Sequence, residues 1–161
     1  MDVEMPELTL CKTSDDFMLA EQMTKDYVKR LNMDLSFQDI DYEMNYFSRM
    51  YSAPRGLFML AKVADELAGG VGYRSLGAGI CEMKRLFVYE NFQGQGIGRL
   101  LCESVISHAR EGGYKLMRLD TLGHMIEAIT LYQHLGFVDI PAYRYNPDPT
   151  TRYLELDLKK T

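Results

Sequence analysis

Three glycines at alternate positions, Gly94, Gly96 and Gly98, stand directly before a segment with helical spacing. At such a turn, unpaired backbone N–H groups and the positive end of the helix dipole form a site for an anion. Glycine lets a phosphate approach the main chain, whereas a turn that binds nothing needs only one glycine with positive φ. The spacing therefore predicts a phosphate-binding loop.

Two other kinds of phosphate loop require residues that this chain lacks. A P-loop needs Gly-Lys-Ser/Thr after its four-residue spacer, and no such triplet occurs. A dinucleotide fingerprint that began at Gly94 would need a glycine where Arg99 stands. Asp120 lies about where a ribose-binding acid would be expected, so the dinucleotide interpretation is weakened but not eliminated.

The other residues with reactive side chains give weaker signals. Cys11, Cys81 and Cys102 are widely spaced and contain no C-x-x-C pair, so neither a disulfide framework nor a zinc knuckle is indicated. The three histidines have no metal-ligand spacing, and no metal site is predicted. A reducing compartment follows from this cysteine usage.

The elements that would position the glycine loop follow from the periodicity of apolar residues. Strands are expected at 8–12, 56–63, 66–76, 81–88, 115–121, 137–140 and 152–158, and helices at 14–31, 39–50, 97–111 and 125–134. Ser14 or Asp15 is the expected cap of the first helix. Short connections favour antiparallel neighbours, and the later strand–helix–strand units imply a mixed α/β (α+β) sheet with helices on both faces.

Composition limits the classes of protein. The 161 residues, 47% of them hydrophobic, suit a single domain over 1–161. The net charge of −5 argues against a nucleic-acid-binding surface. No uncharged stretch has membrane-spanning length, and the N-terminus has no targeting pattern. We therefore expect a cytoplasmic protein without nucleic-acid or membrane partners, and a homodimer is left open.

Two segments resemble signatures of the GNAT acetyltransferase superfamily. The stretch "QGQGIG" (93–98) resembles its Q/R-x-x-G-x-G/A loop, which binds the pyrophosphate of acetyl-CoA, within a similar strand–loop–helix, "MKRLFVYENFQGQGIGRLL". Further on, "AITLYQHLGF" (128–137) resembles the family's later helix-to-strand signature. The resemblance covers the whole chain and implies a GNAT-like, mostly antiparallel sheet of about six to seven strands, with acetyl-CoA as cosubstrate.

The resemblance also assigns cofactor-binding residues. In the family, the strand before the loop separates from its neighbour and pairs through its main chain with the pantetheine arm, which implies this role for Leu86, Phe87 and Val88. The pyrophosphate would be held by the loop residues Gln93, Gly94, Gln95, Gly96, Ile97, Gly98 and Arg99. The alternatives are an ordinary core strand and, for Arg99, a solvated surface residue.

Acyl transfer to an amine needs a base, because only a neutral amine attacks, and the departing thiolate benefits from an acid. Tyr132 matches the tyrosine that serves as this acid in many members, although a core tyrosine would fit the same helix face. Glu82 corresponds in spacing to the strand glutamate that is the base in the histone-acetylating branch. The alternative for Glu82 is a salt bridge to Lys84 or to a neighbouring strand.

The family pattern is not complete, since Met125 stands where many members have Asn. A covalent route through Cys81 or Cys102 has no accompanying histidine signature, so direct transfer is favoured.

The acceptor would meet the segment between the first two helices, the second helix and the loop "PAYRYNPDP" (141–149). Aromatic and acidic side chains there would suit an amine with an apolar body, or simply a helix packed on the sheet: Asp39, Asp41, Tyr42, Glu43, Tyr46 and Phe47. The leading function is N-acetylation of a small amine. The alternatives are acetylation of a protein lysine or N-terminus, and a non-catalytic module that senses acyl-CoA.

Overall fold

The computed structural model describes residues 5–31 and 40–159, which form a seven-stranded sheet in the order β1-β2-β3-β4-β5-β7-β6. In chain order the elements are β1 (Glu7–Leu10), α1 (Ser14–Leu31), α2 (Ile40–Asn45), α3 (Phe47–Met50), β2 (Gly56–Val63), β3 (Glu66–Gly77), β4 (Ile80–Val88), a short 3-10 helix (Glu90–Phe92), α4 (Ile97–Glu111), β5 (Leu116–Thr121), α5 (Ile126–His134), β6 (Val138–Ile140) and β7 (Arg152–Asp157). Neighbouring strands are antiparallel except β4 and β5, which are parallel. The predicted mixed, mostly antiparallel fold is confirmed.

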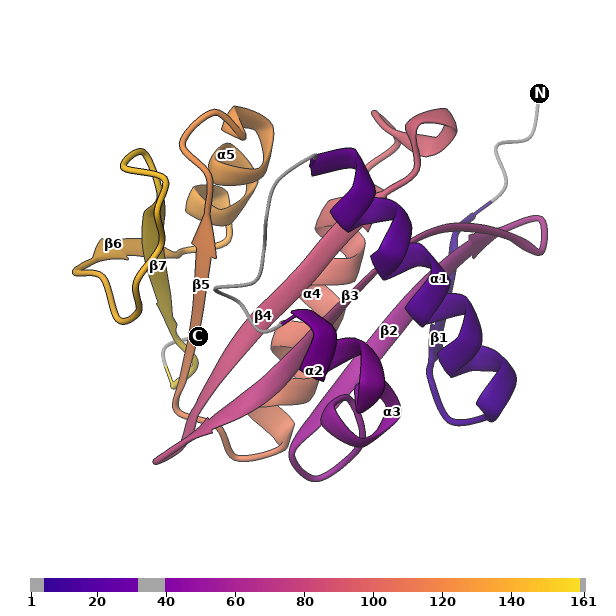
Figure 1. The fold of residues 1–161 in the computed structure, drawn as a ribbon, viewed down its shortest axis with the longest axis horizontal. Helices are drawn as coiled ribbons and strands as arrows, with labels where there is room; N and C mark the ends of the chain where they lie inside the picture. The colour runs from indigo at the N-terminus through magenta and orange to yellow at the C-terminus, as the bar shows by residue number, and fades with distance from the viewer. Residues whose placement is uncertain (1–4, 32–39, 160–161) are drawn as a thin grey trace.

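Helices cover both faces of the sheet, with α1, α2 and α3 on the near face and α4 behind it in Figure 1. Two apolar clusters fill the space between helices and sheet. Residues of α1 and α3 pack with Phe58 and Leu60 in one cluster, and α4 and α5 pack on the opposite face in the other. Among the described residues, no helix combines the length and the apolar character needed to cross a membrane.

The glycines of β3 let side chains pack directly against its backbone. A Cβ atom at Gly70 would lie 2.5 Å from the Met23 Cε atom, and one at Gly72 would lie 2.6 Å from Cδ2 of Phe58. The Met23 end group could move, but a Cβ at either position would also lie 2.9 Å from a backbone carbonyl oxygen, that of Met59 or Leu57, so both positions favour glycine. The near-face cluster therefore depends on these two positions for its close approach to the sheet.

Two local expectations differ from the structure. The helix predicted over 39–50 is divided into α2 and α3 by a turn at Tyr46. The first helix is capped by Thr13, whose Oγ1 accepts the Asp16 N–H at 3.1 Å, while the Asp16 carboxylate accepts the Thr13 N–H at 3.1 Å. This reciprocal pair is a capping box one residue before the predicted cap. Asp39 lies outside the described residues.

Candidate active site

β4 and β5 separate along their length and leave an open edge between them. They pair only from Ile80–Glu82 to Leu116–Arg118. Beyond that point β4 stays paired with β3, and β5 stays paired with β7. Figure 1 shows the two strands diverging towards the end of the sheet that carries α5. The facing edges therefore present backbone groups that have no partner strand among the described residues.

A bulge in β4 lies on this open stretch. Gly72 pairs with Lys84 and Gly70 pairs with Phe87, so β4 carries one extra residue. Arg85 in the bulge has a φ of 64°, an uncommon conformation for a residue other than glycine. Bulges bend a strand and increase its twist, which suits a strand that leaves its neighbour.

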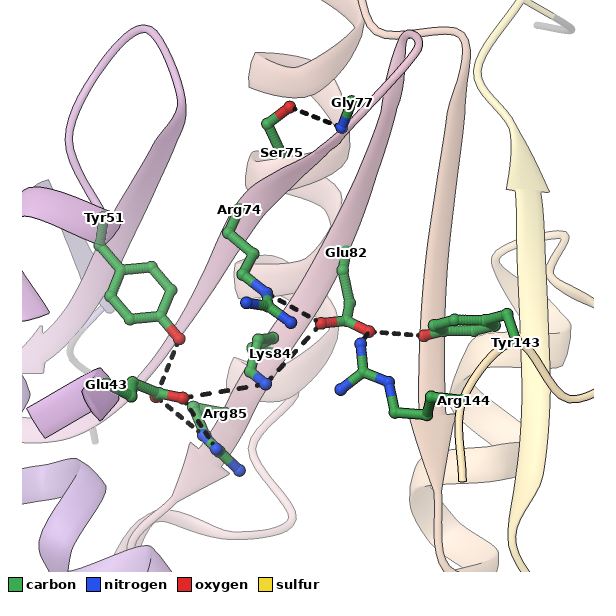
Figure 2. Close-up of polar contacts among 10 residues, drawn as sticks. All are labelled: Glu43, Tyr51, Arg74, Ser75, Gly77, Glu82, Lys84, Arg85, Tyr143 and Arg144. Atoms are coloured by element: carbon green, nitrogen blue, oxygen red, sulfur yellow. Dashed lines mark hydrogen bonds and ion pairs between the residues drawn. The ribbon is translucent and has the colours of Figure 1, made fainter. Parts of the chain in front are cut away.

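The bulge is tied to α2 by a buried ion pair. Arg85 donates to both carboxylate oxygens of Glu43, from Nε at 3.0 Å and from Nη2 at 2.8 Å. The Tyr51 hydroxyl donates to the same carboxylate at 2.9 Å, and Figure 2 shows the three side chains meeting. Burial would raise the pKa of Glu43, but Arg85, Lys84 and the Tyr51 hydroxyl together lower it. The carboxylate is therefore ionised at neutral pH.

A cleft of about 650 Å³ runs along the open edge between α1, β4 and α5. Its lining includes eight predicted cofactor-binding residues: Leu86, Phe87, Val88, Gln93, Gly94, Gly96, Ile97 and Gly98. Gln95 is exposed and does not line the cleft. Arg99 does not line it either, because its Nε donates to Glu103 at 2.7 Å on the exposed side of α4.

The glycine loop places main-chain N–H groups at the outer end of this cleft. Gly94 and Gly96 both have a φ of 79°, and a Cβ at either would meet no atom within 4 Å. Gly96 is the N-cap of α4, and no side chain caps the helix. The N–H groups of its first turn therefore have no helical partner and are available to an anion. At Gly98 a Cβ would only reach ordinary contact with Leu131, at 3.7 Å, so the protein's own packing does not require glycine there.

Gln93 joins the loop to the strand before it. Its side-chain amide Nε2 donates to the Val88 carbonyl at 3.0 Å. This bond links the loop to the last residue of β4.

Arg30 of α1 also lines the cleft, and the sequence analysis did not identify it. Its Nη2 lies 3.1 Å from Glu90 Oε2, and its Cζ lies 5.9 Å from the Phe87 ring centroid. Its partners are about sixty positions away in the chain, so no local pattern could have indicated this cation at the cleft.

A smaller cavity of about 70 Å³ adjoins the cleft at the inner part of the open edge. It is lined by residues 83–86 of β4, by residues 119–121 of β5 with Leu122 just beyond, and by Tyr132 of α5, and among its lining Leu86 and Met125 also line the cleft. Met125, which stands where many GNAT members have Asn, therefore contributes an apolar side chain to both spaces. Burial raises the pKa of Tyr132 well above its ordinary value, so its hydroxyl keeps its proton at neutral pH.

Glu82, the predicted base, is the centre of a second buried ion cluster, which Figure 2 shows. It lines neither the cleft nor the inner cavity. Its carboxylate accepts from Arg74 Nε at 3.2 Å, from the Tyr143 hydroxyl at 2.7 Å and from Arg144. Burial alone would raise its pKa, but Lys84, Arg144 and Tyr143 lower it to about 2. Its contacts are those of the salt-bridge alternative, and proton acceptance by Glu82 stays a prediction.

Lys84 joins the two ion clusters. Its Nζ lies 3.7 Å from Glu82 and 3.8 Å from Glu43, as Figure 2 shows. Burial and the charge of Arg85 lower its pKa to about 8 against the raising effect of the two carboxylates. The clusters therefore form one connected network across β4.

The residues proposed for acceptor binding divide into two groups. Tyr42 and Tyr46 are exposed, with ring centroids 4.6 Å apart, and Phe47 is buried in the near-face cluster. None of them lines the cleft or the inner cavity, which fits the alternative of helices packed on the sheet. The loop over 141–149, called the late loop below, does reach the site, because Asn146 lines the inner cavity.

The thiols lie away from both spaces. Cys81 and Cys102 are buried, and burial raises the pKa of each to about 12. Both therefore remain protonated at neutral pH and are poor nucleophiles.

Comparison with known proteins agrees with this geometry. The acetyltransferase (GNAT) family matches residues 20–137. An uncharacterised N-acetyltransferase of Schizosaccharomyces pombe is 32% identical over 163 residues, which cover 99% of this chain and 97% of that protein. The crystal structure of a GNAT acetyltransferase from Staphylococcus aureus matches with a TM-score of 0.77 and 18% identity, covering 96% of this chain and 99% of the other. The structure of yncA from Salmonella typhimurium with its cofactor acetyl-CoA matches with a TM-score of 0.73 and 16% identity. The match covers 98% of this chain and 96% of the yncA chain.

The ion cluster predicts an acid-sensitive fold. The pKa of Glu82 falls from 4.5 to about 2 on folding. The ionised carboxylate therefore stabilises the folded state fully above pH 4.5, and this stabilisation is lost as pH falls towards 2. The shift corresponds to roughly 3 kcal/mol of unfolding free energy. Urea denaturation at pH 7, 4 and 3 should show a smaller decline in Glu82→Gln than in the wild type. Glu103→Gln, in an exposed pair, is the matched control, and equal declines in all three proteins would contradict the assignment.

Proposed function

The chain belongs to the acetyltransferase (GNAT) family, and from this premise we propose that it transfers the acetyl group of acetyl-CoA directly to an amine acceptor, with a small-molecule amine as the leading candidate. The observation that carries the proposal is the open edge between β4 and β5, which leads from the glycine loop to the inner cavity. The edge offers unpaired main-chain groups to an extended ligand, and the loop offers N–H groups to its anionic part.

The residues present fit coenzyme A. The uncapped first turn of α4 and the open space over Gly94 and Gly96 suit a pyrophosphate. The edge of Leu86 to Val88 has no partner strand on the β5 side, although the Val88 carbonyl accepts from Gln93, and it suits the amide groups of a pantetheine arm. Arg30 adds a cation to the cleft. The yncA structure, which contains acetyl-CoA, has the same fold and supports this choice of cosubstrate.

Tyr132 is the proposed general acid. Its ring lies in the core between α5 and the sheet, and the residue lines the inner cavity. Because burial keeps the hydroxyl protonated at neutral pH, it can give a proton to the departing sulfur. The thioester supplies the activated acyl group, and Tyr132 assists the bond cleavage that releases coenzyme A.

Transfer in one step is favoured over an acyl-cysteine route. A covalent intermediate needs a thiolate beside the thioester, and Cys81 and Cys102 are buried, protonated and outside both spaces. The amine itself is then the nucleophile that attacks the thioester.

The release of free thiol tests the enzyme. Purified protein with acetyl-CoA and a thiol-reactive dye should release coenzyme A only when an amine acceptor is added. The panel contains aliphatic amines, amino acids, polyamines and lysine peptides, and mass spectrometry should find an acetyl group on the active acceptor. A protein that binds acetyl-CoA but releases no thiol with any amine would instead be a sensing module.

The glycine loop predicts a selective loss of cofactor affinity. Gly96→Asp adds a side chain and a negative charge at the anion site, so calorimetry should show acetyl-CoA bound at least about tenfold more weakly, or about 1.4 kcal/mol. Gly113→Asp is the matched control, because Gly113 also has a positive φ, 88°, and open space around it, at the far end of α4. Equal affinities in the two variants would contradict the assignment of the loop.

Tyr132→Phe should separate catalysis from packing. The ring stays in the core while the proton donor is lost, so turnover should fall about 10²-fold with little change in melting temperature or acetyl-CoA affinity. Tyr73→Phe removes a hydroxyl from the same apolar cluster outside both spaces and should keep wild-type turnover. Wild-type turnover in Tyr132→Phe would remove this residue from the mechanism.

A further inference from the structure

Asp120 is a half-buried carboxylate that the proposed mechanism has not used. It lies on β5, in register with Tyr153 of β7, and it lines the inner cavity with Tyr132. Its Oδ2 atom is buried and has no hydrogen-bond partner in the described part of the chain. Folded proteins pair nearly all such atoms, so an unpaired carboxylate oxygen beside a cavity indicates a group kept for a ligand.

Charged and titratable side chains surround Asp120 from several elements. Those that interact electrostatically with it are Tyr27 of α1, Glu82, Lys84 and Arg85 of β4, Tyr132 of α5, Tyr143 and Arg144 of the late loop, and Tyr153 of β7. Burial raises the pKa of Asp120 above its ordinary value; the charge of Arg144 opposes this rise and that of Glu82 adds to it.

The two carboxylates of this region therefore have contrasting environments. Glu82 is held by Arg74, Tyr143 and Arg144, and its pKa is lowered to about 2, so it holds a proton weakly. The Oδ2 atom of Asp120 has no hydrogen-bond partner among the described residues, the residue lines the inner cavity, and its pKa shifts in the opposite direction. Where the pKa values of two neighbouring acids shift in opposite directions, the acid with the raised pKa is the better proton acceptor near neutral pH.

Building on the proposed acetyl transfer, we propose that Asp120 binds the ammonium group of the acceptor in the inner cavity and takes its proton. A cavity of about 70 Å³ admits the amino group and a few neighbouring atoms, since one water occupies about 30 Å³ in the liquid. The acceptor is therefore an unhindered primary amine that arrives as an ammonium ion, with its bulk outside the cavity.

The proton balance of the step closes without another reactant. The ammonium gives one proton to the Asp120 carboxylate, and the freed nitrogen lone pair forms the C–N bond. The C–S bond breaks with its electron pair on sulfur, which takes the proton of Tyr132. The second proton lost by nitrogen restores the Tyr132 hydroxyl, and Asp120 returns its proton to solvent, so one proton is released for each turnover.

The test is the pH dependence of Asp120→Asn, a variant of nearly the same shape. With the panel amine that the wild type acetylates fastest, kcat/KM at pH 7 should fall at least about 10²-fold. Without the carboxylate only the small neutral fraction of the amine reacts, so the rate of the variant should rise about tenfold per pH unit from pH 6 to 9. The wild type should lack this steep rise. Acetyl-CoA affinity and melting temperature should not fall, because the substitution removes the charge from a carboxylate whose Oδ2 atom is buried without a hydrogen-bond partner among the described residues.

Controls separate this role from a structural one and from the rival carboxylate. Asp139→Asn makes the same chemical change at a residue of β6 bonded to Arg152 and should keep the wild-type profile. Asp120→Ala provides a second variant, in which added formate should restore part of the turnover and chloride should not. A pH-independent loss in Asp120→Asn, or the steep profile in Glu82→Gln instead, would overturn the proposal. Inactivity of the wild type with every amine would contradict the proposed function itself.

Discussion

The separation of β4 from β5 costs hydrogen bonds, and contacts elsewhere must hold it in place. An unpaired backbone group away from water is unfavourable, and the left-handed conformation of Arg85 adds strain of roughly 1–3 kcal/mol. The bidentate ion pair between Arg85 and Glu43, supported by the Tyr51 hydroxyl, fixes this strained point to α2. A buried ion pair contributes little net stability, but removing one partner is costly. We therefore interpret the pair as a contact that fixes the geometry of the open edge.

The two ends of that edge obtain their electrostatic character in different ways. At the outer end, the positive potential comes from main-chain N–H groups at the first turn of α4, with Arg30 nearby. At the inner end the charges belong to side chains of both signs, because the network from Glu43 through Lys84 to Glu82 continues to the late loop at Arg144. Ion pairs thus join the late loop to α2 through β4, next to the inner cavity.

Local patterns in the sequence were sufficient for much of this structure. The strand predicted at 56–63 is β2, and the glycine loop lies where its spacing placed it, between β4 and α4. Contacts between distant residues were not predictable in this way. Glu43 and Arg85 are 42 positions apart, and Glu82 and Arg144 are 62 apart. The spacing of apolar residues places each of these side chains on its own element but does not show which distant residue it contacts.

Two other residues show more local limits of the sequence. Motif position suggested Arg99 for the cofactor, which stays a prediction, and the structure pairs it with Glu103 on the exposed side of α4. Asp120 was considered only as a ribose-binding acid. Its unpaired oxygen results from the way β5, α5 and the late loop enclose one small cavity. The sequence of any one of these segments does not indicate that arrangement.

A strand that offers its ligand only main-chain groups can exchange its side chains without changing what it offers. The Phe87 ring packs against Tyr27 and Tyr89 on one face of the sheet, while Leu86 and Val88 pack on the other. Other residues that filled the same volumes would leave the N–H and C=O groups at the open edge unchanged. Evolutionary drift is therefore permitted along this strand and restricted where the backbone itself has an unusual conformation. A strand of this kind can therefore change widely in sequence while its edge keeps the same main-chain donors and acceptors.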